Sequence, residues 1–301
     1  MTEARSARGP LQVDGEVFSM KRVGDYFHLT VVAEGIAERT RPGNFLALAV
    51  GGDTSAALLR RAFSIYRARP SGIYGGTVEI VFAVGGAGTA WLAARQPHDA
   101  LNIVGPLGRP FALPREPVAC ALVGGGYGSA PLFALAERLR ERGCAVHMVL
   151  GASTESRLFG ALEARRAAQS VTVTTVDGSV GIAGLVTDPL PSLLSRNNVE
   201  VVYSCGPMAM LAAVTRVASS HGAWSQTAVE ESMACGIGVC MTCVLPVVGD
   251  DGMTRMVRSC VEGPVFAGDR VRWGSVGTVP AGTLGAPAPD ATIPSGAGGP
   301  Q

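Results

Sequence analysis

Residues 118–143 read VACALVGGGYGSAPLFALAERLRERG, an unbroken apolar run that ends in glycines and passes directly into a segment with helical spacing. A buried strand, a glycine-rich turn and a helix in this order are typical of a parallel, doubly wound sheet. The same alternation continues downstream. Strands are expected at 145–152, 171–177 and 199–206, and helices at 156–167 and 208–222. We therefore predict a doubly wound α/β domain over residues 115–224, whose glycine-rich turn suits a nucleotide.

The region before this domain has a different character. Short apolar segments broken by glycine and proline predict strands, and GTAWLAAR at 88–95 predicts a short helix. Short strands at regular spacing with turn signals indicate a small antiparallel barrel or sandwich. This domain is expected over residues 11–114, with strands at 13–23, 26–34, 44–50, 62–68 and 76–84.

Composition limits the classes of function. The 301 residues carry a formal net charge of +1, so no basic field argues for nucleic acid. No run of about 18 apolar residues suggests a membrane span, and the first ten residues lack the apolar core of a secretory signal. A cytoplasmic protein is expected. The segment 274–301 is rich in Gly, Pro and Ala without apolar periodicity, which predicts a disordered tail.

Four of the seven cysteines are clustered. Cys235, Cys240 and Cys243 have the spacing C-x4-C-x2-C, with Cys260 further on, which is the plant-type [2Fe–2S] arrangement. Glycines between the first two ligands suit a loop that wraps tightly around a cluster. A zinc site usually pairs its cysteines as C-x2-C, and only one such pair is present. We therefore predict a small, loop-rich [2Fe–2S] domain over 225–273. The remaining cysteines, expected to be small buried hydrophobes, are Cys120, Cys144 and Cys205.

The glycine-rich turn suits a phosphate. Glycines let backbone amides approach a pyrophosphate at a helix N-terminus, and the glycines concerned are Gly124, Gly125, Gly126 and Gly128. The strict G-x-G-x-x-G pattern is not met, because Ser129 follows Gly128. No Asp or Glu ends the second strand, where a ribose ligand is expected. Ser153 and Arg157 lie there instead, so the sequence leaves NAD and NADP open.

A second phosphate-binding constellation lies in the N-terminal region. Arg61 and Ser64 on one strand suit a diphosphate, since a guanidinium matches phosphate oxygens. Gly88 and Thr89 would add backbone amides and a hydroxyl at a helix start. The alternative to a phosphate-binding site is an ordinary edge strand whose arginines face solvent.

The order of these regions and their motifs resemble a known family, the electron-transfer subunits of NAD-linked dihydroorotate dehydrogenases, which are ferredoxin-reductase-like proteins. The resemblance covers about residues 11–272. It is carried by LLRRAFSIY (58–66), GGAGT (85–89), VGPLGRPF (104–111), LVGGGYGSAP (122–131), YSCGPMAML (203–211) and EESMACGIGVCMTCV (230–244) with the distant Cys260.

The resemblance implies which residues bind the cofactors. FAD would contact an R-x-x-S segment, a three-residue strand and a G-T pair, and Cys-Gly-Pro would lie beside the nicotinamide. The family usually has proline at position 62 and often arginine at position 83, where this chain has alanine; the flavin is expected to remain. The residues implied are Arg61, Ala62, Phe63, Ser64, Val81, Phe82, Ala83, Gly88, Thr89, Cys205, Gly206 and Pro207.

The resemblance also implies an electron relay in pyrimidine (UMP) biosynthesis. A partner catalytic subunit with FMN, two copies with two of this chain, would oxidise dihydroorotate. Electrons would cross the [2Fe–2S] cluster to FAD and then to NAD⁺. No catalytic residue for dihydroorotate is expected here, because the four histidines are scattered. Two alternatives stay open: a subunit of an NAD(P)H-dependent ferredoxin oxidoreductase or of a hydrogenase, and a non-enzymatic zinc-binding scaffold.

Overall fold

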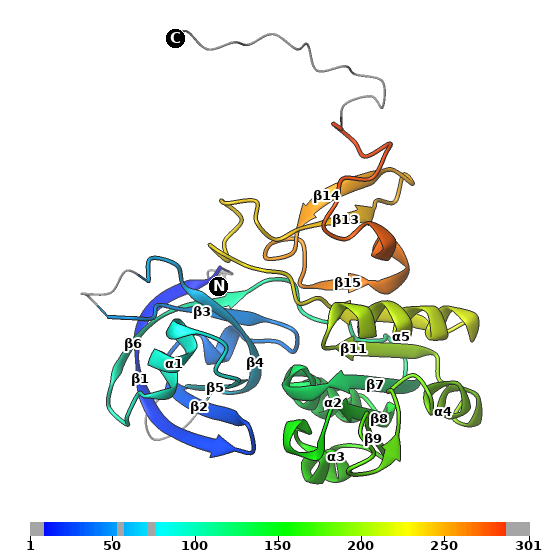
Figure 1. Cartoon of the computed structure of the whole chain (residues 1–301), viewed down its shortest axis with the longest axis horizontal. Coiled ribbons are helices and arrows are strands. Elements are labelled where there is room, and N and C mark those ends of the chain that lie inside the picture. The colour runs from blue at the N-terminus through cyan, green and yellow to red at the C-terminus, as the bar shows by residue number, and fades with distance from the viewer. Residues whose placement is uncertain (1–8, 53–56, 71–75, 287–301) are drawn as a thin grey trace, which may run out of the picture.

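The computed structural model describes residues 9–52, 57–70 and 76–286 (Figure 1). Its strands form a closed barrel, a seven-stranded sheet and a two-stranded sheet. Figure 1 shows the barrel beside the larger sheet, with the two-stranded sheet above them in the view. Within the described ranges, no helix combines the length and the apolar character that crossing a membrane requires.

The N-terminal region forms the barrel. Its elements are β1 (Leu11–Val23), β2 (Tyr26–Val32), the 3-10 helix η1 (Ala37–Arg39), β3 (Phe45–Leu48), β4 (Arg61–Arg69), β5 (Thr77–Phe82), α1 (Ala87–Ala93) and β6 (Ala100–Leu107). The strands close in the order β1-β2-β5-β4-β3-β6, and neighbouring strands are antiparallel. Alternate residues point inward, so apolar side chains such as Leu29, Leu46 and Ile80 fill the interior. The predicted antiparallel barrel is confirmed.

The central region forms the seven-stranded sheet. Its strands are β7 (Ala119–Gly125), β8 (Ala145–Ala152), β9 (Ser170–Thr175), β10 (Ile182–Ala183), β11 (Val201–Cys205), β12 (Trp224–Ala228) and β15 (Val265–Ala267). The order is β10-β9-β8-β7-β11-β12-β15, and all pairs are parallel except β12 with β15. The helices are the 3-10 turns η2 (Gly126–Ser129) and η3 (Glu155–Arg157), with α2 (Ala130–Glu141), α3 (Ala161–Ala167), α4 (Leu190–Arg196) and α5 (Met208–Ser220).

Helices cover both faces of this sheet. Residues of α2 and α3 pack on the face that carries Leu122 and Met148. Residues of α4 and α5 pack on the opposite face, which carries Val123 and Val149. The doubly wound parallel sheet is therefore confirmed. The helix expected at 156–167 is wrong in its first part, because Gly160 adopts a left-handed conformation and α3 begins only after it.

The region after β12 shares this sheet rather than standing apart from it. β12 and β15 extend the sheet, whereas β13 (Val244–Val248) and β14 (Thr254–Arg258) form the separate hairpin, followed by η4 (Gly268–Arg270) and η5 (Trp273–Ser275). Within the expected tail, Leu284 donates a backbone hydrogen bond to Thr254 (2.9 Å). The first part of the tail thus lies against β14. Residues 287–301 lie outside the described residues.

A polar contact joins the barrel to the central region. Tyr66 on β4 donates a hydrogen bond to Glu163 on α3, and Arg67 forms an ion pair with the same carboxylate. Burial raises the pKa of the Tyr66 hydroxyl, and the carboxylate of Glu163 raises it further, so the group stays a neutral donor. The contact links β4 of the barrel to α3 of the central region.

We expect Tyr66→Phe to lower the free energy of unfolding by about 1 kcal/mol, the usual net contribution of one hydrogen bond, because Glu163 keeps its ion pair with Arg67. A urea titration measures the change. Tyr127→Phe is the matched control, since no hydrogen bond of its hydroxyl is found among the described residues. Equal midpoints for the two variants would contradict the role given to Tyr66.

Candidate cofactor and electron-transfer sites

A cavity of about 680 Å³ opens where the barrel meets the central sheet. Its wall contains every residue that the sequence predicted for FAD: Arg61, Ala62, Phe63, Ser64, Val81, Phe82, Ala83, Gly88 and Thr89. The structure thus brings three separate segments of the barrel to one surface. Further lining residues that the sequence analysis did not single out are Phe45, Tyr127, Glu230, Glu231, Ser232 and Met233. We name this space the barrel cavity.

The two adjacent arginines have different surroundings. Arg60 donates a hydrogen bond to the Asn102 carbonyl (3.0 Å) and another to the side chain of Asn102, so it fastens β4 to β6. Arg61 points into the barrel cavity, and among the described residues no carboxylate pairs with it. The side-chain hydrogen bonds of Arg61 go to the backbone carbonyls of Leu59 (2.6 Å) and Arg60 (3.4 Å). Sequence alone could not separate these roles.

The start of α1 completes a cradle for a diphosphate. A Cβ on Gly88 would lie 3.0 Å from the Arg61 Nε, so the absence of a side chain at this position lets the guanidinium lie close against the start of α1. The Thr89 hydroxyl accepts hydrogen bonds from the backbone N–H groups of Gly85 and Gly86 (2.9 and 3.1 Å) and thereby shapes the loop. The first N–H groups of α1 have no intrahelical acceptor. Arginine and these N–H groups together fit phosphate oxygens.

The two departures from the family pattern lie in this wall. Ala62 and Ala83 both line the barrel cavity and add no charge. Among the described lining residues, Arg61 is the sole positively charged side chain. The residues present therefore fit FAD, with Arg61 carrying the whole charge contact.

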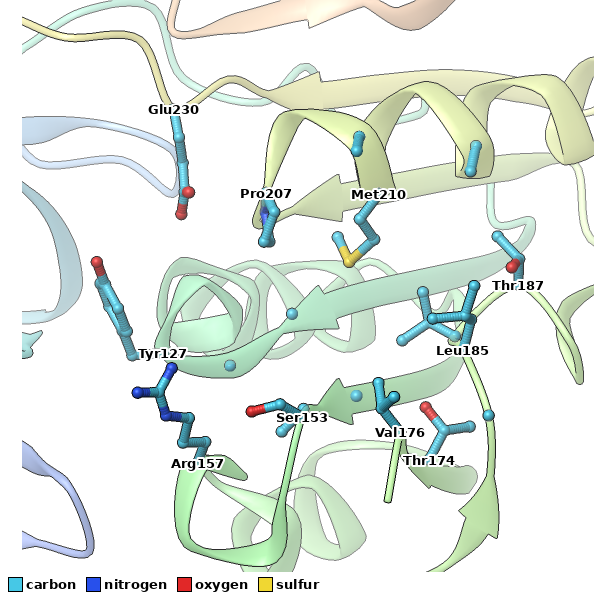
Figure 2. A pocket seen from close by; sticks show the side chains of 18 of the residues that line it. Tyr127, Ser153, Arg157, Thr174, Val176, Leu185, Thr187, Pro207, Met210 and Glu230 are labelled. Carbon is cyan, nitrogen blue, oxygen red and sulfur yellow. The ribbon is translucent and has the colours of Figure 1, made fainter. Parts of the chain in front are cut away.

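A second cavity, of about 490 Å³, lies at the carboxyl ends of β7, β8 and β9 (Figure 2). Of the residues predicted for the nucleotide, Gly125, Gly126 and Pro207 line it. Gly128 lines the barrel cavity instead. The remaining three predicted residues line neither cavity: Gly124, Cys205 and Gly206. A crevice at the carboxyl ends of parallel strands is the usual place for a nucleotide. We name this space the sheet cavity.

The two cavities meet at two side chains. Tyr127 and Glu230 line both of them. Partial burial raises the pKa of Glu230, and burial together with Glu230 raises the pKa of Tyr127. Burial also raises the pKa of the nearby Cys205 thiol, which stays protonated and unreactive. Tyr127 and Glu230 therefore lie between the two cavities.

The cysteine loop follows β12 after the intervening residues 229–234. Gly238 has φ of +87°, and a Cβ there would lie 2.5 Å from Val261 Cγ2, so both conformation and space require glycine. The Gly238 carbonyl accepts a hydrogen bond from Arg258 Nη1 (2.8 Å). This loop, residues 235–243, is thereby held against the segment that carries Cys260.

The four predicted ligands lie in two pairs. Cys240 donates a backbone hydrogen bond to Cys235 Sγ (3.4 Å), and Cys260 donates one to Cys243 Sγ (3.4 Å). Among the described residues, no three metal-binding side chains converge on one ion position. Two cysteines for each iron is what a [2Fe–2S] cluster requires, so the arrangement fits that cluster.

Hydrogen bonds also favour thiolate in the exposed pair. The Thr242 hydroxyl donates to Cys240 Sγ (3.1 Å), and this bond with backbone N–H groups lowers the pKa of Cys240 to about 6. Burial alone would raise the pKa of Cys235, but backbone N–H groups outweigh it and the pKa is lowered. Burial raises the pKa of Cys260 to about 12. Thiolates are the form that binds iron.

The inner cysteine pair touches the barrel. Cys243 and Cys260 are buried and pack with Phe45, Ala47 and Leu107. Phe45 also lines the barrel cavity. Ala62 and Met233 also pack on this cluster and line that cavity, so Phe45 lies between the cysteine pair and the barrel cavity together with these two residues.

Comparisons with known proteins agree with this geometry. Residues 230–272 match the family described as the iron-sulfur cluster binding domain of dihydroorotate dehydrogenase B. The electron transfer subunit of dihydroorotate dehydrogenase B (NAD(+)) from Desulforamulus reducens is 31% identical over 262 residues, which cover 86% of this chain and 98% of that protein. The subunit of the same name from Geobacillus thermodenitrificans is 36% identical over 248 residues, covering 81% and 92%.

Solved structures show the same fold. An NADH-dependent reduced ferredoxin–NADP oxidoreductase superposes with a TM-score of 0.75 and 28% identity, covering 86% of this chain and 90% of that one. A ferredoxin NADP⁺ reductase from Neisseria gonorrhoeae with bound FAD and NADP has a TM-score of 0.56 and 16% identity, covering 71% and 92%, and shares the fold. Sequence identity and coverage together place the chain in the family of electron transfer subunits of dihydroorotate dehydrogenase B (NAD(+)).

Proposed function

We propose that this chain carries electrons from a dihydroorotate-oxidising catalytic subunit, which holds FMN, to NAD⁺ in pyrimidine biosynthesis. Its cofactors are a [2Fe–2S] cluster and FAD. The observation that carries the proposal is the order of the sites in space. The cysteine pair packs on Phe45, Phe45 lines the barrel cavity, and the barrel cavity meets the sheet cavity at Tyr127 and Glu230.

Each site contributes binding and orientation. Bound FAD supplies both single-electron and hydride chemistry, so it can join a one-electron carrier to a nicotinamide. Arg61 and the start of α1 hold its diphosphate, and Val81, Phe82 and Ala83 give the ring system an apolar wall. The glycine-rich turn would bind the pyrophosphate of NAD⁺. Cys235 with Cys240, and Cys243 with Cys260, would each hold one iron of the cluster.

The division of the chain follows these roles. We assign 11–114 to FAD, 115–224 to NAD⁺ and 225–273 to the cluster, with 274–301 as a tail. The relatives are named as electron transfer subunits, which supports a separate catalytic partner. The assembly is proposed to hold two copies of each chain.

The test is reconstitution. The chain purified without oxygen is expected to show flavin and iron–sulfur absorption and, combined with an FMN-containing dihydroorotate dehydrogenase, to reduce NAD⁺ at the expense of dihydroorotate. A colourless protein would overturn the cofactor assignment. A coloured protein that reduces only ferredoxin would favour the second candidate, a subunit of a ferredoxin oxidoreductase, which the likeness to the solved ferredoxin–NADP oxidoreductase supports.

An exposed apolar surface surrounds the cysteine loop and suits the catalytic partner. Its members are Ile237, Val239, Met241 and Val261, and Val239 is 76% exposed. An apolar surface beside a redox centre excludes water from a short electron path and marks a binding face.

We expect Val239→Glu to weaken association with the catalytic subunit by about tenfold, the loss typical of one apolar interface anchor. Sedimentation of the mixed subunits measures it. Leu162→Glu on α3 is the matched control, since Leu162 is 78% exposed and lies away from the cysteine loop. The proposed docking face is wrong if both variants associate equally well, provided that the cluster spectrum is unchanged.

A further inference from the structure

One cysteine of the exposed pair accepts a hydrogen bond from a side chain. The Thr242 hydroxyl donates to Cys240 Sγ (3.1 Å). Backbone N–H groups donate to two of the other ligand sulfurs, Cys235 Sγ and Cys243 Sγ. A backbone donor is set by the path of the loop, whatever side chains the loop carries. The hydroxyl depends on which residue stands at position 242, so a substitution can remove this donor and leave the backbone donors in place.

The backbone between these two residues has an uncommon conformation. Met241 has φ of +58°, in the left-handed region that residues other than glycine seldom occupy. The Met241 side chain is 51% exposed, so packing in a core does not account for this conformation. The left-handed residue lies where the chain must turn for the Thr242 hydroxyl to reach a sulfur two residues earlier. Strained backbone of this kind is concentrated at functional sites.

The acceptor distinguishes Thr242 from a threonine that only shapes a turn. The hydroxyl of an exposed threonine in a turn commonly bonds to a backbone carbonyl, as Thr278 does with the Ser275 carbonyl (2.9 Å). Thr242 is also exposed, but among the described residues its side chain has no hydrogen bond other than the one to Cys240 Sγ. The contact therefore acts on the sulfur.

A hydrogen bond to a ligand sulfur does not affect the two oxidation states of a cluster equally. One-electron reduction adds one negative charge, which the cluster shares with its cysteine sulfurs. A donor stabilises the more negative state more strongly, because hydrogen bonds to charged groups are stronger than those to neutral groups. Hydrogen bonds to the sulfurs are thus among the factors that set the reduction potential. The hydroxyl keeps its proton throughout, so the step moves one electron and no proton.

We propose that Thr242 helps to set the reduction potential of the cluster: its hydroxyl raises that potential and favours acceptance of an electron from the catalytic subunit. The inference rests on the proposed function, which assigns a [2Fe–2S] cluster to the four cysteines. Cys240 stands between Val239 and Met241, two members of the exposed apolar surface assigned to the partner. The sulfur that Thr242 contacts therefore belongs to the side of the loop where electrons would enter.

The test is a redox titration of the full chain loaded with FAD and cluster, followed by the electron paramagnetic resonance signal of the reduced cluster. We expect Thr242→Val, which removes the hydroxyl and keeps the shape, to lower the equilibrium constant for reduction by about fivefold, the difference between hydrogen bonds to charged and to neutral groups. This change is about 40 mV for a one-electron couple. Thr242→Ser keeps the hydroxyl and should stay close to the unchanged chain. Only chains that hold a cluster give the signal, so the potential does not depend on how much cluster a variant assembles.

Thr278→Val is the matched control, because it removes an exposed hydroxyl that bonds to a carbonyl and not to a sulfur. Its potential should equal that of the unchanged chain. The inference is overturned if Thr242→Val has the potential of the unchanged chain. It is also overturned if Thr242→Ser or Thr278→Val shifts the potential as much as Thr242→Val, since the shift then does not come from the hydroxyl at the sulfur. If the unchanged chain gives no iron–sulfur signal at all, the cluster assignment of the proposed function fails, and this inference fails with it.

Discussion

Cys243→Ala is expected to abolish the iron–sulfur absorption and to stop electron flow from dihydroorotate to NAD⁺, while the bound flavin still accepts electrons from NADH. Cys243 is 2% exposed and forms the inner pair with Cys260. Removing a residue that only hydrogen-bonds a metal ligand already lowers activity by up to about a hundredfold. Removing a ligand itself should lower it at least as much. Rates with dihydroorotate and with ferricyanide, measured on the same preparation, separate the two routes.

Cys120→Ala is the matched control for this variant. Cys120 is also fully buried, but it lies on β7 away from the loop, as a small apolar side chain whose pKa burial raises to about 12. Its variant should keep the cluster spectrum and the complete electron route. A normal iron content in Cys243→Ala would show that Cys243 is not a ligand.

Arg61→Ala is expected to raise the dissociation constant for FAD by about thirtyfold or more, because truncating one partner of a hydrogen-bonded charge pair costs about 2–5 kcal/mol. The effect should be large in this chain because no second cation lines the described wall of the barrel cavity. Fluorescence titration of the flavin-free chain measures the change, and Arg61→Lys should restore part of the affinity.

The neighbouring arginine provides the control. Arg60→Ala removes the same side chain one position earlier, where it bonds to Asn102 and not to the cavity. We expect lower stability of the barrel and an FAD affinity close to that of the unchanged chain. If Arg60→Ala and Arg61→Ala lose FAD to the same degree, the loss reflects damage to the barrel and not a phosphate contact.

The sequence predicted the regular parts of the fold because their signals are local. The alternation of apolar strand and helix from residue 118 onward indicated the doubly wound sheet, which the structure confirms. It did not indicate that β12 and β15 join that sheet, since β15 pairs with β12 from almost forty residues away, between Val265 and Ala228. Periodicity also did not predict the left-handed conformation of Gly160, after which α3 begins.

The residues of the candidate sites likewise fall into those that the sequence predicted and those that only the structure revealed. The residues that the motifs assigned to the flavin all line one cavity wall, because the R-x-x-S strand and the G-T turn are each short and contiguous. No sequence motif could identify Tyr127, Glu230 or Phe45, since each of these residues borders two sites that meet only in the folded chain. In the sequence Glu230 shortly precedes the cysteine loop. Only the tertiary structure shows that it lines both cavities.

The four cysteines, the glycine-rich turn and the alternation of strands and helices determine by themselves that this chain holds a cluster and a nucleotide, because spacing along the chain sets which ligands a loop can present. The tertiary structure alone decided which groups meet. Tyr26 and Arg157 are 131 residues apart, and they touch because the barrel packs on the sheet. Contacts of this kind depend on the burial of whole surfaces, which no local pattern encodes.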